Sequence, residues 1–204
     1  MKIICIGRNF ADHAKELGND KPSSPVIFLK PDTALLRNND PFFLPDFSKE
    51  IHHEIELVIK IKRLGKNIQA KFAHKYYDEI GLGVDFTARD VQFELREKGL
   101  PWEKAKAFDS SAAISKKFIS KTELGDLTDL SFHLEKNGEK VQIGNTNQMI
   151  FTIEEIICYV SKYFTLKIGD LIYTGTPSGV GKVEINDELS GYLKDYKLFD
   201  FKIK

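Results

Sequence analysis

HHEIELVIKI, residues 52–61, is the stretch that decides the fold, because its polar and apolar residues alternate with a period of two. Successive side chains of a β-strand point to opposite faces, so Glu54 and Glu56 share one face while the isoleucines and Leu57 line the other. A strand rises about 3.3 Å per residue, so the two carboxylates begin about 6.7 Å apart and can converge on one small ion. The same pattern also describes a strand whose solvent face carries glutamates beside lysines. The stretch alone leaves both interpretations open.

A third carboxylate follows in EIGLGVDFTARDVQ, residues 79–92. An apolar strand with two glycines ends at Asp85, and the next residues, Thr87-Ala88-Arg89-Asp90, are typical of a helix cap and first turn. Asp85 is therefore either a cap or turn residue, or the third member of an acidic set with Glu54 and Glu56. Such an all-oxygen set without a thiolate suits Mg²⁺ or Mn²⁺ better than Zn²⁺.

Strand patterns dominate the rest of the chain. The expected strands are Ile3–Ile6, Val26–Leu29, Glu54–Ile61, Ile80–Val84, Leu130–Lys136, Lys140–Ile143, Leu171–Thr174 and Leu198–Ile203. Asn137-Gly138 predicts a type I′ turn, because both residues tolerate positive φ. The expected helices are fewer: Asn67–Tyr77, Ala88–Lys98 and Ile153–Tyr163, the last with Thr152 as N-cap and Glu155 completing a capping box. This distribution favours an α+β, mainly β, fold over a doubly wound one.

The composition argues against several classes of function. The 204 residues suffice for one domain with a sizeable core, or two small ones, and no linker divides them. Thirty basic and thirty acidic residues balance, so the charge favours neither nucleic acid nor an anionic membrane as partner. Cys5 and Cys158 lie in apolar surroundings typical of reduced, buried thiols. With no signal-peptide pattern and no run of about 18 apolar residues, we expect a soluble cytoplasmic protein.

Seven segments together resemble the fumarylacetoacetate hydrolase family, in that family's order. They are Gly7–His13, Phe28–Pro31, His53–Leu57, Asp85–Gln92, Gly99–Trp102, Lys106–Asp109 and Thr174–Gly181, and they cover nearly the whole chain. The similarity is to short single-domain members related to acylpyruvases, oxaloacetate decarboxylases and 2-hydroxyhepta-2,4-diene-1,7-dioate isomerases. It implies one catalytic domain over residues 1–204, with a roll of mixed β-sheets like the family's C-terminal domain. It also implies a short N-terminal lid helix, in a segment of about residues 9–24, and a homodimer.

By this resemblance, Glu54, Glu56 and Asp85 are the three protein ligands of a catalytic Mg²⁺ or Mn²⁺. His52 shares the face of the two glutamates, so it is either a fourth ligand or a partner that orients a carboxylate. The family's ligand set does not require it. Neither His52 nor His53 is therefore assigned a catalytic role.

The resemblance assigns three further catalytic residues, His13, Glu16 and Lys106. His13 and Glu16 are three residues apart, hence on one helical face, and correspond to the dyad that activates water when the lid closes. Taken without the resemblance, they are an ordinary solvated pair. Lys106 corresponds to an active-site cation that stabilises developing negative charge, although the same pattern also describes a surface lysine packed on apolar neighbours.

Arg89, Gln92 and Thr176 correspond to substrate-binding residues. Arg89 and Gln92 are three apart on the helix predicted after Asp85, so both can face one pocket. The loop Thr174–Gly181 has neither the spacing of a Walker loop nor that of a dinucleotide fingerprint. We expect its backbone N–H groups and the Thr176 hydroxyl to bind a substrate carboxylate. The alternative is that the loop is only a glycine-rich turn.

The expected activity is divalent-metal-dependent hydrolysis of a C–C bond in an acylpyruvate, a 2,4-dioxo acid. The 1-carboxylate and 2-oxo oxygens of the substrate would chelate the metal, which would stabilise the pyruvate enolate. Water activated by His13 and Glu16 would attack the distal carbonyl. Oxaloacetate decarboxylation, or isomerisation of an unsaturated oxo-diacid, would use the same site without water attack. A metal-binding interaction module is the non-enzymatic alternative. The sequence does not specify the acyl group of the small oxo-acid substrate.

Overall fold

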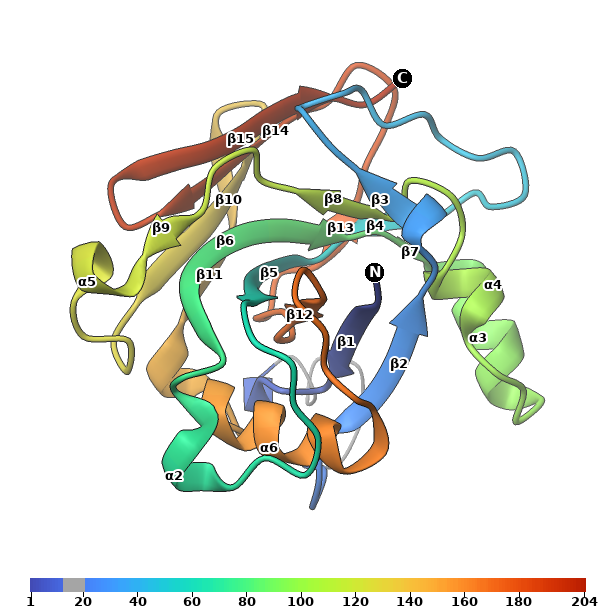
Figure 1. The fold of residues 1–204 in the computed structure, drawn as a ribbon. Coiled ribbons are helices and arrows are strands. Elements are labelled where there is room, and N and C mark those ends of the chain that lie inside the picture. The colour runs from blue at the N-terminus through green and yellow to red at the C-terminus, as the bar shows by residue number, and fades with distance from the viewer. Residues whose placement is uncertain (13–20) are drawn as a thin grey trace.

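The computed structural model describes residues 1–12 and 21–204, and its largest element is a strongly curved mixed sheet (Figure 1). The strand order in this sheet is β2-β1-β12-β5-β6-β8-β3, and β9 pairs with another part of β6. The strands are β1 (Ile3–Gly7), β2 (Val26–Lys30), β3 (Leu35–Leu36), β5 (Ile55–Ile61), β6 (Tyr77–Asp85), β8 (Ala112–Ile114), β9 (Ile119–Ser120) and β12 (Leu171–Tyr173). The β1–β12 and β3–β8 pairs are parallel, and the other pairs are antiparallel.

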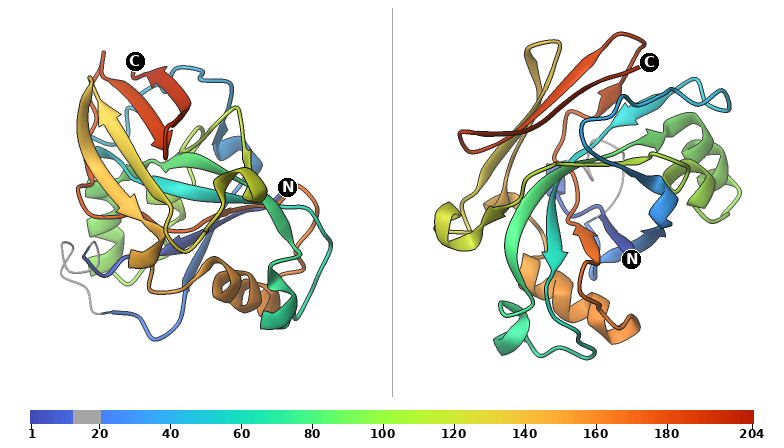
Figure 2. Two further views of the ribbon diagram at one scale, coloured as in Figure 1. Left: turned by 90° about the vertical axis from the view of Figure 1, so that its left-hand side faces the viewer. Right: turned by 45° about the horizontal axis from the view of Figure 1, so that its top comes forward.

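Two smaller sheets complete the fold. The antiparallel order β11-β10-β14-β15 joins Glu139–Asn145, Ser131–Lys136, Glu188–Leu193 and Tyr196–Lys202, and the order β13-β4-β7 joins Gly181–Lys182, Ile51–His53 and Thr87–Ala88. The predicted turn between β10 and β11 is confirmed in its main requirement, because Asn137 and Gly138 both have positive φ, 56° and 82°. Figure 2 shows the four-stranded sheet packed against the curved sheet.

The helices are short. They are α2 (Ala70–Ala73), α3 (Arg89–Glu97), α4 (Glu103–Lys106), α5 (Lys121–Leu124) and α6 (Ile153–Tyr163), with the 3-10 turns η1 (Asp32–Ala34) and η2 (Thr146–Gln148). The predicted start of α6 is confirmed, because Thr152 and Glu155 form both bonds of a capping box. In the part of the chain that the structure describes, no helix is long and apolar enough to cross a membrane.

The predicted helix over Asn67–Tyr77 is confirmed only for Ala70–Ala73, and its predicted ends are wrong. Asn67 takes a left-handed backbone conformation with φ 51°. Tyr77 instead begins β6, opposite Ile61, and its buried ring directs the hydroxyl to Glu154 at 2.6 Å. Tertiary burial of one tyrosine therefore overrides the local helical pattern.

Residues 54–59 are buried on both faces of the sheet, and only Lys60 near the end of β5 is exposed, so Glu54 and Glu56 do not lie on a solvent-exposed face. Ile55, Leu57, Ile59 and Ile61 belong to the main core, with residues of α6 and of the four-stranded sheet. Val58, on the Glu56 face, packs with Cys5 of β1 and Tyr173 of β12 in a smaller cluster. The predicted mainly β fold of mixed sheets is confirmed. The carboxylates of residues 54 and 56 therefore enter the interior of the protein.

Candidate active site

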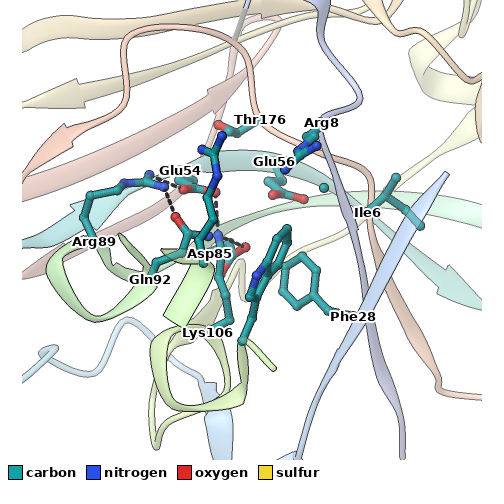
Figure 3. A pocket seen from close by; sticks show the side chains of 13 residues that line it. Ile6, Arg8, Phe28, Glu54, Glu56, Asp85, Arg89, Gln92, Lys106 and Thr176 are labelled. Carbon is teal, nitrogen blue, oxygen red and sulfur yellow. Dashed lines mark hydrogen bonds and ion pairs between the residues drawn. The ribbon is translucent and has the colours of Figure 1, made fainter. Parts of the chain in front are cut away.

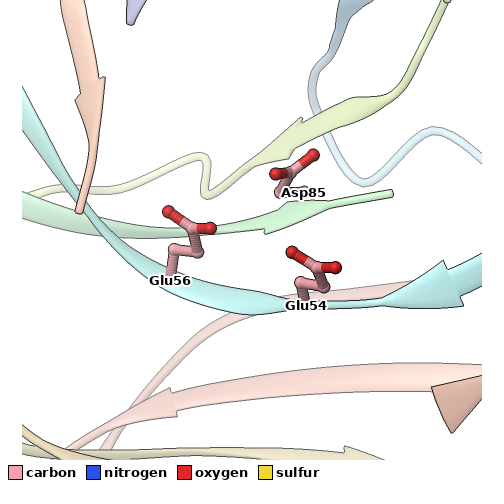
Figure 4. Close-up of side chains that lie close together, drawn as sticks. All are labelled: Glu54, Glu56 and Asp85. Atoms are coloured by element: carbon pink, nitrogen blue, oxygen red, sulfur yellow. The ribbon is translucent and has the colours of Figure 1, made fainter. Parts of the chain in front are cut away.

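Strand register brings the three predicted carboxylates together (Figure 4). Ile55 pairs with Val84 and Glu56 with Gly83, and the Asp85 backbone N–H donates to the Glu54 carbonyl at 2.8 Å. Glu54 and Asp85 are thus cross-strand neighbours, and Glu56 lies two residues along the same face. One oxygen of each side chain lies within 4.8 Å of one oxygen of the others, and all three residues are at most 4% exposed.

Buried cations surround two of these carboxylates. The Lys106 ammonium lies 2.8 Å from Glu54 Oε2 and 2.8 Å from Asp85 Oδ2. Lys30 Nζ lies 2.7 Å from Asp85 Oδ1, and the Arg89 guanidinium pairs with Glu54 Oε1. Burial alone would lower the pKa of Lys106, but the charges of Asp85 and Glu54 outweigh burial and raise it. Lys106 is therefore an ammonium group in this site, not a neutral base.

Glu56 has no such cationic partner within the part of the chain that the structure describes. Its carboxylate accepts a hydrogen bond from Gly175 N at 2.7 Å, and no Lys or Arg of residues 1–12 and 21–204 forms an ion pair with it. Burial, then the charge of Asp85, raise the pKa of Glu56 well above its ordinary value. Within the same described residues, buried Asp85 Oδ1 accepts no hydrogen bond, despite the nearby Lys30. A hard divalent cation fits this set of oxygen ligands, because it would place positive charge beside the buried Glu56 carboxylate, with which no described Lys or Arg forms an ion pair.

Arg89 and Gln92 lie on the α3 face that lines this pocket (Figure 3). Arg89 Nη1 donates to Gln92 Oε1 at 2.6 Å, so the pair holds the guanidinium in place. The prediction that Thr87 caps this helix is wrong, because the N-cap is Ala88 and has no side-chain cap bond. The Thr87 hydroxyl instead donates to Glu54 Oε1 at 3.0 Å and accepts from Lys106 Nζ at 2.6 Å. Strand β7 thus contributes a hydroxyl to the carboxylate network.

Thr176 also lines the pocket, but the loop around it differs in part from the expectation. The Gly175 N–H is used by Glu56 and does not face substrate. Gly175 has φ 102°, and a Cβ there would lie 2.7 Å from Asn9 Cβ, so glycine is required. Thr176 Oγ1 accepts from Gln142 Nε2 at 2.9 Å, which leaves the hydroxyl proton available to donate into the pocket.

The histidines lie outside the acidic cluster or outside the described residues. Among the described residues, the acidic cluster consists of the three carboxylates and does not include His52. His52 Nδ1 instead lies 3.5 Å from Arg89 Nε. His53 Nδ1 lies 2.9 Å from Gln142 Oε1, and burial lowers the His53 pKa to about 4. His52 and His53 therefore flank the site through Arg89 and Gln142. His13 and Glu16, with most of the expected lid, lie outside the described residues.

Several residues that line this pocket, or that contact the side chains lining it, had no predicted role. They are Lys30, Gln142, Arg8, Phe28, Arg96 and Trp102. Lys30 and Trp102 lie in segments that carry the family resemblance, which was a usable signal. Arg96 is seven residues after Arg89, hence on the same face of α3. Gln142 had no signal, because only tertiary packing brings β11 to Thr176.

Replacing Lys30 with methionine is expected to destabilise the metal-free protein by about 3–5 kcal/mol, the range for breaking a buried ion pair by removing one partner. The lost ammonium contacts Asp85, and it also donates to the Lys106 carbonyl and to Ser111 O and Oγ at 3.0 and 2.9 Å. Urea unfolding in EDTA measures the change. The control is Lys60→Met, which removes an exposed pair with Glu79 and should cost about 0–1 kcal/mol. Equal losses in the two variants would contradict the assigned role of Lys30.

Comparison with known proteins extends these observations. Residues 2–204 match the family described as fumarylacetoacetate (FAA) hydrolase C-terminal. Mouse mitochondrial oxaloacetate tautomerase FAHD1 is 45% identical over 99% of this chain and 91% of its own. Escherichia coli oxaloacetate tautomerase YcgM is 43% identical over 93% and 86%. The Pseudomonas aeruginosa fumarylpyruvate hydrolase structure with Mn²⁺ and pyruvate is 34% identical, with a TM-score of 0.93 over 100% of this chain and 89% of that one.

Proposed function

Since the chain belongs to the fumarylacetoacetate hydrolase family, we propose that it is a divalent-metal-dependent enzyme that converts a small 2-oxo acid through its enolate. The charge balance of the site carries the proposal. Three buried carboxylates lie beside three cations, Lys30, Lys106 and Arg89. Among the described residues, none of these cations forms an ion pair with Glu56. A divalent ion would leave an excess of two positive charges. The enolate of a 2-oxo acid carries two negative charges on neighbouring oxygens and matches that excess.

Different residues of the pocket bind the substrate and stabilise its negative charge. A bound divalent ion would act as a Lewis acid on the 2-oxo group. Lys106 presents a fixed ammonium where negative charge develops, and its contacts with Glu54 and Asp85 orient it before the reaction. Arg89, held by Glu54 and Gln92, offers its remaining N–H groups to the substrate carboxylate. Thr176 donates its hydroxyl proton to the same ligand.

We propose keto–enol tautomerisation of oxaloacetate as the leading reaction. It moves one proton between C3 and the 2-oxo oxygen and consumes no other reactant. Enolate stabilisation is the main requirement of that reaction, and the described residues supply it. The names of the mouse and Escherichia coli relatives support this choice.

Acylpyruvate C–C hydrolysis is the second candidate. The relative named fumarylpyruvate hydrolase, with a TM-score of 0.93, favours it. Hydrolysis requires an activated water in addition to the enolate site, and His13 and Glu16 stay the predicted dyad for that step. Decarboxylation and diene-dioate isomerisation also stay predictions. The relatives are named as enzymes, which argues against an interaction module.

Several finer expectations are also proposals. The metal is Mg²⁺ or Mn²⁺, residues 1–204 form one catalytic domain, and the protein acts as a homodimer in the cytoplasm. The structure of one relative contains Mn²⁺, which supports Mg²⁺ or Mn²⁺ over Zn²⁺ as the metal of this chain. The mouse relative is named as mitochondrial, so location is a separate question for each member of the family.

Removing divalent metal is expected to reduce enol-oxaloacetate conversion to the uncatalysed rate, because the triad then lacks the charge that stabilises the enolate. The measurement follows the ultraviolet absorbance of the enol after EDTA treatment and after return of Mg²⁺ or Mn²⁺. Acetylpyruvate, fumarylpyruvate and an unsaturated oxo-diacid form the rest of the panel. Full activity in excess EDTA, or no activity on any of these acids with metal, would overturn the proposed function.

A further inference from the structure

Two arginines at the outer end of the pocket take no part in the carboxylate network. Arg8 directly follows β1, and Arg96 lies in α3. Both line the pocket that contains the triad. Within residues 1–12 and 21–204, neither guanidinium forms an ion pair or a side-chain hydrogen bond. The two positive charges are therefore not used within the described protein.

The two guanidinium groups line the same pocket. Burial, then the positive charge of Arg96, lower the pKa of Arg8. The two positive charges at this pocket therefore repel each other. An anionic group between them would relieve the repulsion and accept charge-assisted hydrogen bonds from both.

Arg8 is held in position by unusual local structure. Its backbone has φ 60°, a left-handed conformation that residues other than glycine and asparagine seldom adopt. Its Cζ lies 6.0 Å from the centre of the Trp102 ring, a cation–π distance. Trp102 in turn packs edge-on against Phe28 at 6.1 Å. The guanidinium is therefore presented at the pocket on an aromatic support.

Arg96 reaches the pocket along the same helix face as the substrate-binding residues. Arg89, Gln92 and Arg96 occupy positions i, i+3 and i+7 of α3, which places them on one stripe. In Figure 3, Arg8 and Arg89 lie on either side of the acidic triad. The pocket thus has an acidic inner end, an apolar wall of Phe28 and Trp102, and a basic outer end.

We propose that Arg8 and Arg96 bind the second carboxylate of a 2-oxo diacid whose 2-oxo acid end lies at the triad. The inference rests on the proposed function and narrows its substrate to 2-oxo acids that carry a second carboxylate. Phe28 and Trp102 would contact the methylene carbons between the two ends. A monoacid with the same chelating end would gain no charge-assisted hydrogen bonds from the half-buried Arg8 or the exposed Arg96.

A matched pair of ligands tests this subsite without turnover. The probes 2-oxoglutarate and 2-oxopentanoate share a five-carbon chain and the 2-oxo acid end, and they differ only in the distal carboxylate. Calorimetry with Mn²⁺-loaded protein should show that 2-oxoglutarate binds at least about tenfold more tightly, the factor expected from hydrogen bonds to a charged group. The same titrations on metal-free protein measure the preference independently of the metal.

Variants of the two arginines should remove the preference selectively. Arg8→Asn, in which asparagine tolerates the left-handed backbone, and Arg96→Gln should each lower the ratio of the two affinities about five- to tenfold. The affinity for 2-oxopentanoate should change by less than about twofold, because that ligand does not reach the pair. Arg8→Lys should retain part of the preference. The control is Arg63→Gln, which removes a guanidinium stacked on Tyr76 away from the pocket and should leave the ratio unchanged.

Three results would overturn the inference. They are no preference for the diacid in the unmodified protein, an unchanged ratio in Arg8→Asn and Arg96→Gln, and equal weakening of both ligands in either variant. The last result would mean that the arginine only maintains the structure of the pocket. If the preference is present but oxaloacetate is not converted, the subsite stands and the proposed reaction fails.

Discussion

Replacing Glu56 with glutamine is expected to weaken Mn²⁺ and Mg²⁺ binding by at least about 100-fold while the metal-free protein stays folded. Loss of a partner that only orients a metal ligand typically costs 10- to 100-fold in affinity, and Glu56 would be a ligand itself. Glutamine keeps the shape of the side chain and can still accept the hydrogen bond from Gly175 N. Calorimetric titration with each metal measures the effect. Enzymatic activity at subsaturating metal should fall in parallel.

The same variant is expected to change how stability depends on pH. The pKa of Glu56 is raised in the folded protein, first by burial and then by the charge of Asp85. A group with a raised folded-state pKa contributes stability that is full below its unfolded pKa and is lost as pH rises through the folded pKa. In EDTA, the unmodified protein should therefore lose stability as pH rises above about 4.3, the unfolded value for glutamate. Glu56→Gln should lack that loss and be at least as stable at pH 8.

Two comparisons decide the interpretation of this variant. Glu79→Gln changes an exposed glutamate at the far end of β6, and it should alter neither metal affinity nor stability measurably. Unchanged Mn²⁺ affinity in Glu56→Gln would show that Glu56 is not a ligand. Loss of metal binding accompanied by unfolding of the metal-free protein would instead mean that its carboxylate stabilises the fold.

The β-sheet and the acidic cluster were predictable because local pattern and register agree. Alternation over residues 54–61 places Glu54 and Glu56 on one face in any register. Asp85 could be added because it ends an apolar strand, and pairing of that strand with β5 puts it opposite Glu54. The burial of that face could not be predicted, because the side chains of Cys5 and Tyr173 that pack with Val58 come from β1 and β12, at opposite ends of the chain.

The remaining parts of the site depend on contacts between segments that are distant in sequence. Lys30 reaches Asp85 from the end of β2, and Gln142 reaches Thr176 from β11. A lysine or a glutamine in a strand carries no pattern that distinguishes such a role from solvent exposure. Thr87 was assigned a local role that it does not have. Its position before a helix predicts a cap, but its hydroxyl donates to the buried Glu54 carboxylate, which is a stronger acceptor.

Replacing His13 with alanine is expected to separate the two candidate reactions. Hydrolysis of fumarylpyruvate needs an activated water, whereas tautomerisation of oxaloacetate needs stabilisation of its enolate. General-base catalysis typically contributes about 10²- to 10⁴-fold, so His13→Ala should reduce hydrolysis by a factor in that range and tautomerisation by clearly less. Steady-state kcat for both substrates at saturating Mn²⁺ measures the difference. Glu54→Ala should abolish both reactions, because both require the metal site.

The comparison has a matched control and a clear contrary outcome. His74→Ala changes an exposed histidine at the end of α2 and should leave both rates unchanged. Equal losses of both activities in His13→Ala would mean that His13 acts in the shared enolate step, and the water-activating role would be wrong. If the unmodified protein hydrolyses no acylpyruvate but tautomerises oxaloacetate, the leading reaction is supported and a hydrolytic role for His13 is excluded. In that case the enolate site of Glu54, Glu56, Asp85 and Lys106 is the part of the family's chemistry that this chain uses.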